Sequence, residues 1–88
     1  MTKEEQKQVY IRKYIFAEIH KKTKYFLKYP GAYIKIEIDI QFIRIALIVW
    51  GFYNNIIDIR YSNFDKDIED FYNAVDDFKI VCENTYKY

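Results

Sequence analysis

The sequence contains very little cysteine, histidine, proline and glycine. Among its 88 residues are one Cys, one His, one Pro and two Gly. A single cysteine excludes an internal disulfide, and a single histidine leaves no second ring for a His-based metal or catalytic site. Residues 1–9 are charged and polar where a secretory signal would be apolar. We therefore expect a cytoplasmic protein, in the host cytoplasm if a phage encodes it, without metal or cofactor.

Long hydrophobic runs are also missing. The most apolar window, residues 40–53, is fourteen residues long and contains Arg44. A membrane-spanning helix needs about 20 apolar residues, so we expect no membrane segment and no membrane partner. Hydrophobic residues make up 51% of the chain and charged residues 31%, a composition that favours a folded domain over disorder. The length predicts one domain, residues 1–88.

The abundant residues are those with AT-rich codons, including 15 Ile, 11 Lys and 10 Tyr. This bias points to an AT-rich genome, such as a low-GC bacterium, a phage or plasmid within one, or an archaeal virus. The charge is uneven along the chain. Residues 1–28 hold eight basic and three acidic side chains, whereas residues 61–88 hold three basic and seven acidic ones.

Two amphipathic helices are predicted, one at each end of the chain. Thr2 and Glu5 fit a capping box, which starts a helix that Pro30 and Gly31 end. The apolar stripe of this first helix consists of Ile11, Ile15, Ile19 and Phe26. Regular helix geometry also places Lys22 inside this stripe. The second stripe consists of Ile68, Phe71, Val75, Phe78 and Cys82.

Three strands are predicted between the helices. Residues 33–40 alternate between isoleucine and polar or aromatic residues, and a phase shift over residues 39–42 marks a turn. Asn54 and Asn55 tolerate the left-handed backbone of a two-residue hairpin loop. That register would place these residues on the core side of the sheet: Ile48, Trp50, Phe52, Ile57, Ile59 and Tyr61. The predicted fold class is α+β, in the order helix, three-stranded antiparallel meander, helix.

The residues able to perform chemistry are scattered. His20 falls on the polar side of the first helix, Cys82 in an apolar stripe, and Ser62 where a helix cap is expected. Glu37 and Asp39 share a strand face that Asp58 also reaches in some registers, and a solvated edge is the simpler interpretation. No catalytic residue is assigned, and we predict that the protein is not an enzyme.

An aliphatic patch is the first candidate binding surface. With both helices on the Trp50 side of the sheet, the reverse face would be open to a protein partner or a second copy. With one helix on each side, the patch would be core. The patch and its charged neighbours are Ile43, Ile45, Leu47, Val49, Asp58 and Arg60.

A lysine ridge gives a nucleic-acid-binding alternative. Lys13, Lys21, Lys24 and Lys28 line the polar side of the first helix and could follow a phosphate backbone. The order of elements resembles that of double-stranded-RNA-binding domains. That family grips phosphates with lysines at the start of its second helix, where residues 65–70 read Asp-Lys-Asp-Ile-Glu-Asp. This departure counts against the implied activity.

The sequence groups apolar and charged residues into surfaces but does not group candidate catalytic residues. This pattern favours a small protein that binds another protein. Its size, its AT-rich origin and its lack of catalytic groups resemble those of accessory proteins of phages and mobile elements, including anti-defence proteins of the anti-CRISPR type. We therefore predict an inhibitor or accessory factor that binds a protein partner or forms a homodimer. A structural homodimeric domain is the second alternative.

Overall fold

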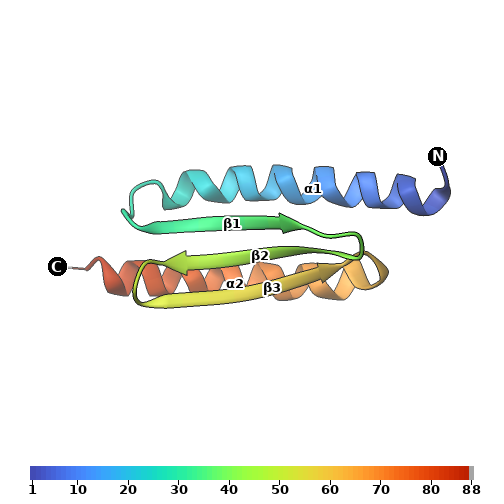
Figure 1. Cartoon of the computed structure of the whole chain (residues 1–88). Helices are drawn as coiled ribbons and strands as arrows, with labels where there is room; N and C mark the ends of the chain where they lie inside the picture. Colours follow the sequence, from blue (N-terminus) through green and yellow to red (C-terminus); the bar gives the residue numbers. More distant parts are fainter. Residues whose placement is uncertain (88) are drawn as a thin grey trace.

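The computed structural model describes residues 1–87, which form two helices and one three-stranded sheet (Figure 1). The order is α-β-β-β-α, so the predicted α+β fold class is confirmed. The elements are α1 (Lys3–Phe26), β1 (Ala32–Ile38), β2 (Phe42–Val49), β3 (Tyr53–Arg60), a 3-10 turn (Tyr61–Asn63) and α2 (Phe64–Thr85).

Helix α1 begins at the predicted capping box. The backbone N–H of Glu5 donates to Thr2 Oγ1 over 3.1 Å, and the Glu5 carboxylate accepts from the Thr2 backbone N–H over 3.4 Å. The helix continues without a break past Lys22. This half-buried side chain lies with its Nζ 5.2 Å from the centre of the Tyr72 ring and 4.0 Å from the carboxylate of Glu18. A cation–π contact and an ion pair thus keep the ammonium satisfied at the edge of the apolar stripe.

The three strands form an antiparallel meander in the order β1-β2-β3. The turn between β1 and β2 lies at the predicted phase shift, and Asp39 N–H donates to the Phe42 carbonyl over 2.9 Å. The second turn lies elsewhere than predicted. Val49 pairs with Tyr53, and residues 50–52 form the loop, with Gly51 at φ 81°.

The prediction of an Asn54–Asn55 hairpin loop is therefore wrong, and both asparagines lie within β3. Gly51 adopts the left-handed backbone without the Cβ cost that asparagine bears. The true register differs from the predicted one by an odd number of residues, so every β2 side chain changes the face it shares with β3. Ile45 now pairs with Ile57, and Ile43 pairs with Ile59.

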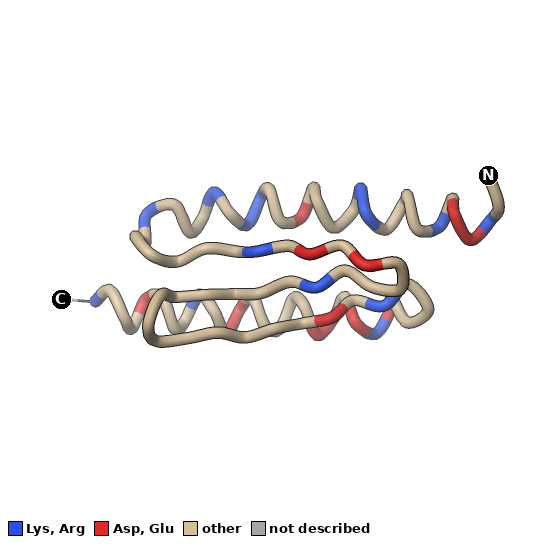
Figure 2. The backbone as a smooth tube through the Cα atoms, viewed as in Figure 1, with Lys and Arg blue, Asp and Glu red and all other residues tan. Residues whose placement is uncertain are grey.

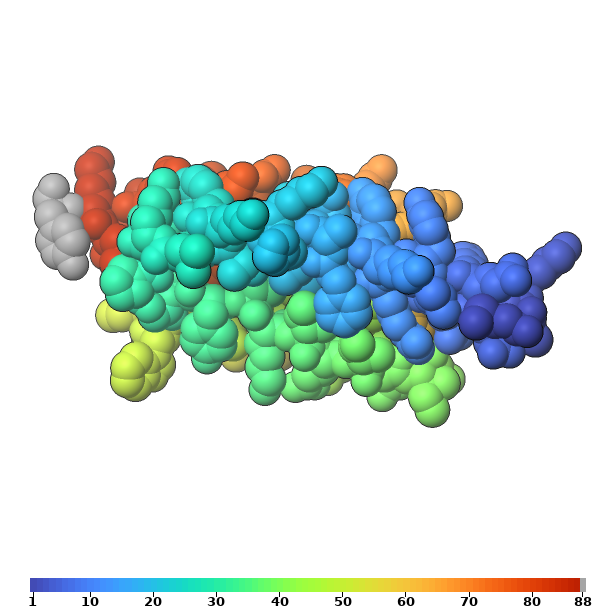
Figure 3. Space-filling model, turned by 90° about the horizontal axis from the view of Figure 1, so that it is seen from above, coloured from blue at the N-terminus to red at the C-terminus, as the bar shows by residue number. Residues whose placement is uncertain are grey.

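Both helices pack on the same side of the sheet (Figures 1 and 3). In Figure 3, α2 (orange to red) lies on the same side of the strands (green to yellow) as α1 (blue). Helix α1 lies along β1, and α2 crosses behind β2 and β3. The molecule is elongated, with extents of 52 × 18 × 18 Å.

The aliphatic patch predicted to bind a partner is core. Ile43, Ile45, Leu47 and Val49 are at most 1% exposed, because they face the two helices. Asp58 and Arg60 are on the opposite, open face, since neighbouring residues of a strand alternate between faces. The prediction that Trp50 leads the core face is wrong as well, because Trp50 is 80% exposed.

The two helical stripes meet these aliphatic side chains. From α1 the four predicted residues Ile11, Ile15, Ile19 and Phe26 are buried. From α2 the buried residues include Phe71, Val75, Phe78 and Cys82. The ring centroids of Phe26 and Phe78 lie 4.7 Å apart, so the two helices contact each other directly through these rings.

Candidate binding surface

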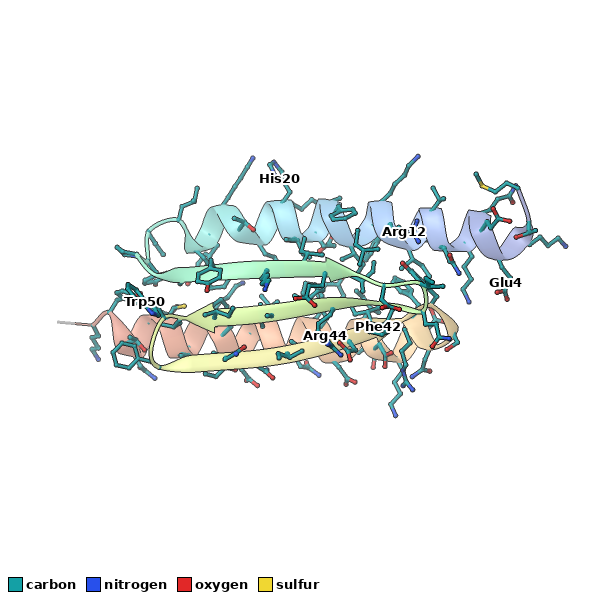
Figure 4. The ribbon with its side chains drawn as sticks, in the orientation of Figure 1. Glu4, Arg12, His20, Phe42, Arg44 and Trp50 are labelled. Atoms are coloured by element: carbon teal, nitrogen blue, oxygen red, sulfur yellow. The ribbon has the colours of Figure 1, made fainter. Side chains whose placement is uncertain are left out.

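The sheet presents one face to the helices and leaves the other face uncovered (Figure 4). Register places its side chains in rows across the three strands. The rows are Tyr33–Ile48–Asn54, Lys35–Ala46–Ile56 and Glu37–Arg44–Asp58, followed by Phe42–Arg60. We call this surface the open face.

The centre of the open face is a shallow hollow of about 130 Å³. It exists because Ala46, the smallest side chain of the face, lies between the larger Lys35 and Ile56. Ala46, Ile48 and Ile56 give the hollow apolar surface, and Ile56 is 55% exposed; the other lining residues are polar or charged: Lys35, Glu37, Arg44 and Asn54. Exposed apolar surface is unfavourable in water and is the usual centre of a protein–protein contact.

The charges on the open face are paired with one another. Arg44 donates to both carboxylate oxygens of Asp58, from Nε over 2.7 Å and from Nη2 over 3.0 Å. These hydrogen bonds from Arg44 hold the pKa of Asp58 below its ordinary value. Lys35 lies 3.4 Å from Glu37 in a second ion pair. The face therefore offers apolar area with neutralised charge rather than a field of one sign.

The buried carboxylate of Asp67 fixes one corner of this surface, a role that the sequence did not reveal. Asp67 is 5% exposed and accepts from the backbone N–H of Arg60 over 3.0 Å, from Arg60 Nε over 3.2 Å and from Asn63 Nδ2 over 3.1 Å. Burial by itself raises the pKa of this carboxyl group, but the hydrogen bonds from Arg60 and Asn63 outweigh it and hold the pKa below its ordinary value. Asp67 thereby joins the end of β3 to the start of α2.

The residues considered for catalysis do not converge. His20 is exposed on α1, whereas Cys82 is buried in the core on α2, and burial raises the pKa of its thiol. Of the three carboxylates, Glu37 and Asp58 are held by basic partners on the open face. Within residues 1–87 no cluster of three or more His, Cys, Asp or Glu side chains is placed to hold a metal ion.

A larger hollow of about 510 Å³ lies at the far end of the molecule from Trp50 (Figure 4). Its lining residues come from the start of α1, the turn between β1 and β2 and the 3-10 turn. They are Glu4, Lys7, Gln8, Ile40, Gln41, Phe42, Arg60, Tyr61 and Ser62. The lining combines both charges with amide and apolar groups and includes neither His20 nor Cys82.

The four lysines of the predicted ridge are all exposed, and they follow one side of α1 and its C-terminal extension (Figure 2). Lys21 lies 3.7 Å from Glu18, and Lys28 Nζ lies 4.4 Å from the centre of the Tyr25 ring. The start of α2 exposes Asp65, so it presents negative charge where double-stranded-RNA-binding domains present lysines. Nucleic-acid binding by the ridge stays a prediction.

Comparison with known protein families, with curated proteins and with solved structures finds no match to this chain. Function is therefore argued from the surfaces of the molecule. Among residues 1–87, neither helix has the length and apolar character required to cross a bilayer.

Proposed function

We propose that this protein acts by binding another protein through its open face and performs no catalysis of its own. The observation that supports this proposal is a sheet covered on one side only, whose uncovered side combines an apolar hollow with paired charges. Interfaces between proteins likewise combine apolar area with polar groups, and arginine is enriched in them.

The hollow over Ala46 suits a partner that inserts one apolar side chain there. Arg44 and Lys35 flank it and keep donors available for the polar rim of a partner. The pairing of Arg44 with Asp58 lowers the attraction for a polyanion, because a phosphate would have to compete with a carboxylate that is already bound. The open face therefore favours a folded protein over nucleic acid as its occupant.

In this proposal the chain is a stoichiometric accessory or inhibitory factor of a phage or other mobile element. The AT-rich composition supports that origin, and the small size supports a role that needs only one surface. A second copy of the chain is the other candidate occupant of the same face, and the experiment below separates the two.

Ala46→Glu tests the proposal, because it fills the hollow with a charged side chain without touching the core. Ala17→Glu is the matched control, since Ala17 is exposed on α1 and does not belong to the sheet. We expect the wild type and Ala17→Glu to capture the same protein from a lysate of cells of the source, and Ala46→Glu to lose it. Light scattering of the purified protein shows whether a second copy occupies the face instead. Capture that is unchanged in Ala46→Glu, from a monomeric wild type, would contradict the proposal.

A further inference from the structure

Three of the four most exposed large apolar side chains among residues 2–87 lie at one end of the molecule, and the fourth, Ile40, lies at the other. Leu27 is 76% exposed, Trp50 is 80% exposed and Phe52 is 79% exposed. Leu27 follows α1, and the other two belong to the loop between β2 and β3. The two segments lie at the same end (Figure 1), where Trp50 N–H donates to the Gly31 carbonyl over 3.0 Å. We call this surface the apolar end.

We propose that the apolar end docks on an anionic lipid surface. The hollows of about 130 and 510 Å³ lie on the open face and at the opposite end, and neither is lined by Leu27, Trp50 or Phe52. A protein partner would need a matching pocket for each protruding ring, whereas the interfacial region of a bilayer accepts them without one. Tryptophan in particular favours that region, because its ring is apolar and its N–H remains hydrated there.

Charge supports the same occupant. Four lysines lie in the last turns of the two helices or just after them, near this end: Lys24, Lys28, Lys79 and Lys87. Nearby, Glu83 accepts a hydrogen bond from the Tyr25 hydroxyl over 2.9 Å. Lys28 and Lys79 both lie against the Tyr25 ring, with their Nζ atoms 4.4 and 5.0 Å from its centre. Lysines beside exposed apolar rings are the arrangement that attracts a peripheral protein to anionic lipid headgroups.

The opposite end has another character. There the start of α1 carries Lys3 and Lys7 beside Glu4 and Glu5, and the start of α2 carries Lys66 between Asp65 and Asp67 (Figure 2). In this proposal an anionic surface orients the molecule with its basic, apolar end inward, because the lysines of the opposite end are offset by neighbouring carboxylates. Docking of this kind requires no membrane-spanning helix. The expectation of no membrane partner was based only on the lack of a spanning segment. The open face runs along the 52 Å axis and stays accessible when the end is docked.

Trp50 is the only tryptophan and reports directly on this contact. We expect its fluorescence to shift to shorter wavelength, and the protein to sediment, with mixed phosphatidylcholine and phosphatidylglycerol vesicles. Neither is expected with phosphatidylcholine alone. Phe52→Ser should weaken binding at least about tenfold, because it removes an inserted ring. Lys24→Gln and Lys28→Gln should each weaken it by about fivefold at low salt.

The matched controls lie at the opposite end. Ile40→Ser alters a side chain that is 82% exposed in the turn between β1 and β2, and Lys7→Gln removes an exposed lysine. Both should bind vesicles as the wild type does. Equal binding to neutral vesicles, no binding to either kind, or equal losses in Phe52→Ser and Ile40→Ser would each overturn the proposal. A shift of Trp50 emission that depends on protein concentration in the absence of lipid would also overturn it, since a second copy of the protein would then cover the apolar end.

Discussion

Replacing Asp67 with alanine is expected to destabilise the protein more than any other substitution of a charged residue near the open face. The variant loses the acceptor for the Arg60 backbone N–H and for the Asn63 amide, over 3.0 and 3.1 Å. Each hydrogen bond to a charged group contributes about 1–2 kcal/mol net at a site of this kind. Since solvent screens the guanidinium of Arg60, we add nothing for its ion pair. The expected loss is about 2–4 kcal/mol.

A loss of this size is large for a domain of 88 residues, whose total stability is on the order of 4–13 kcal/mol. Thermal unfolding followed by far-UV circular dichroism should show a decrease in Tm of roughly 10 °C or more. Asp70→Ala is the control, because it removes an exposed carboxylate from the same helix. If the Tm of Asp67→Ala falls no further than the Tm of Asp70→Ala, the role assigned to the buried carboxylate is wrong.

The same carboxylate gives a pH dependence with a definite sign. The pKa of Asp67 is lower in the folded protein than in the unfolded chain, so its stabilisation is complete above the unfolded value of about 3.9. That stabilisation disappears as the pH falls through the lower, folded value. The urea midpoint of the wild type should therefore decrease below about pH 4 more steeply than that of Asp67→Asn, which has no charge to lose.

Two further substitutions test the register of the sheet. Ile45→Ala should cost about 2–5 kcal/mol because it opens a cavity in the core, whereas Ile56→Ala, on the open face, should cost less than about 1 kcal/mol; urea denaturation compares them. Similar losses in both would mean that the faces are assigned incorrectly. Gly51→Ala should cost about 1 kcal/mol through its φ of 81° alone, since an added Cβ meets no atom within 4 Å. An unchanged Tm would contradict the loop conformation.

Much of the fold could be predicted from local patterns. The capping box at Thr2, the alternation of β1 and the stripe of α2 each depend on residues close together in the sequence, and all three appear in the structure. The hairpin could not be settled in this way. Gly51 and the Asn54–Asn55 pair lie three residues apart, and either can form a hairpin turn. Choosing between them requires knowing which face of β2 the helices cover, and that depends on packing across the whole molecule.

The candidate site was harder still to predict. Exposure of Trp50 follows directly from the loop at Gly51, so the misplaced turn also hid the apolar end. Asp67 looked like an ordinary acidic residue in the first turns of a helix. Its function as an acceptor depends on the backbone N–H of Arg60, which points toward it only once β3 and α2 meet.

The elongated shape has a practical consequence for how the molecule is handled. The first and last described residues, Met1 and Lys87, lie at opposite ends of the rod (Figure 1), whose longest extent is 52 Å. A purification tag or fluorescent protein fused at the C-terminus would be adjacent to Leu27 and Trp50 and would shield them. A fusion at the N-terminus would leave them accessible, so the choice of fusion site alone can decide whether an assay detects binding.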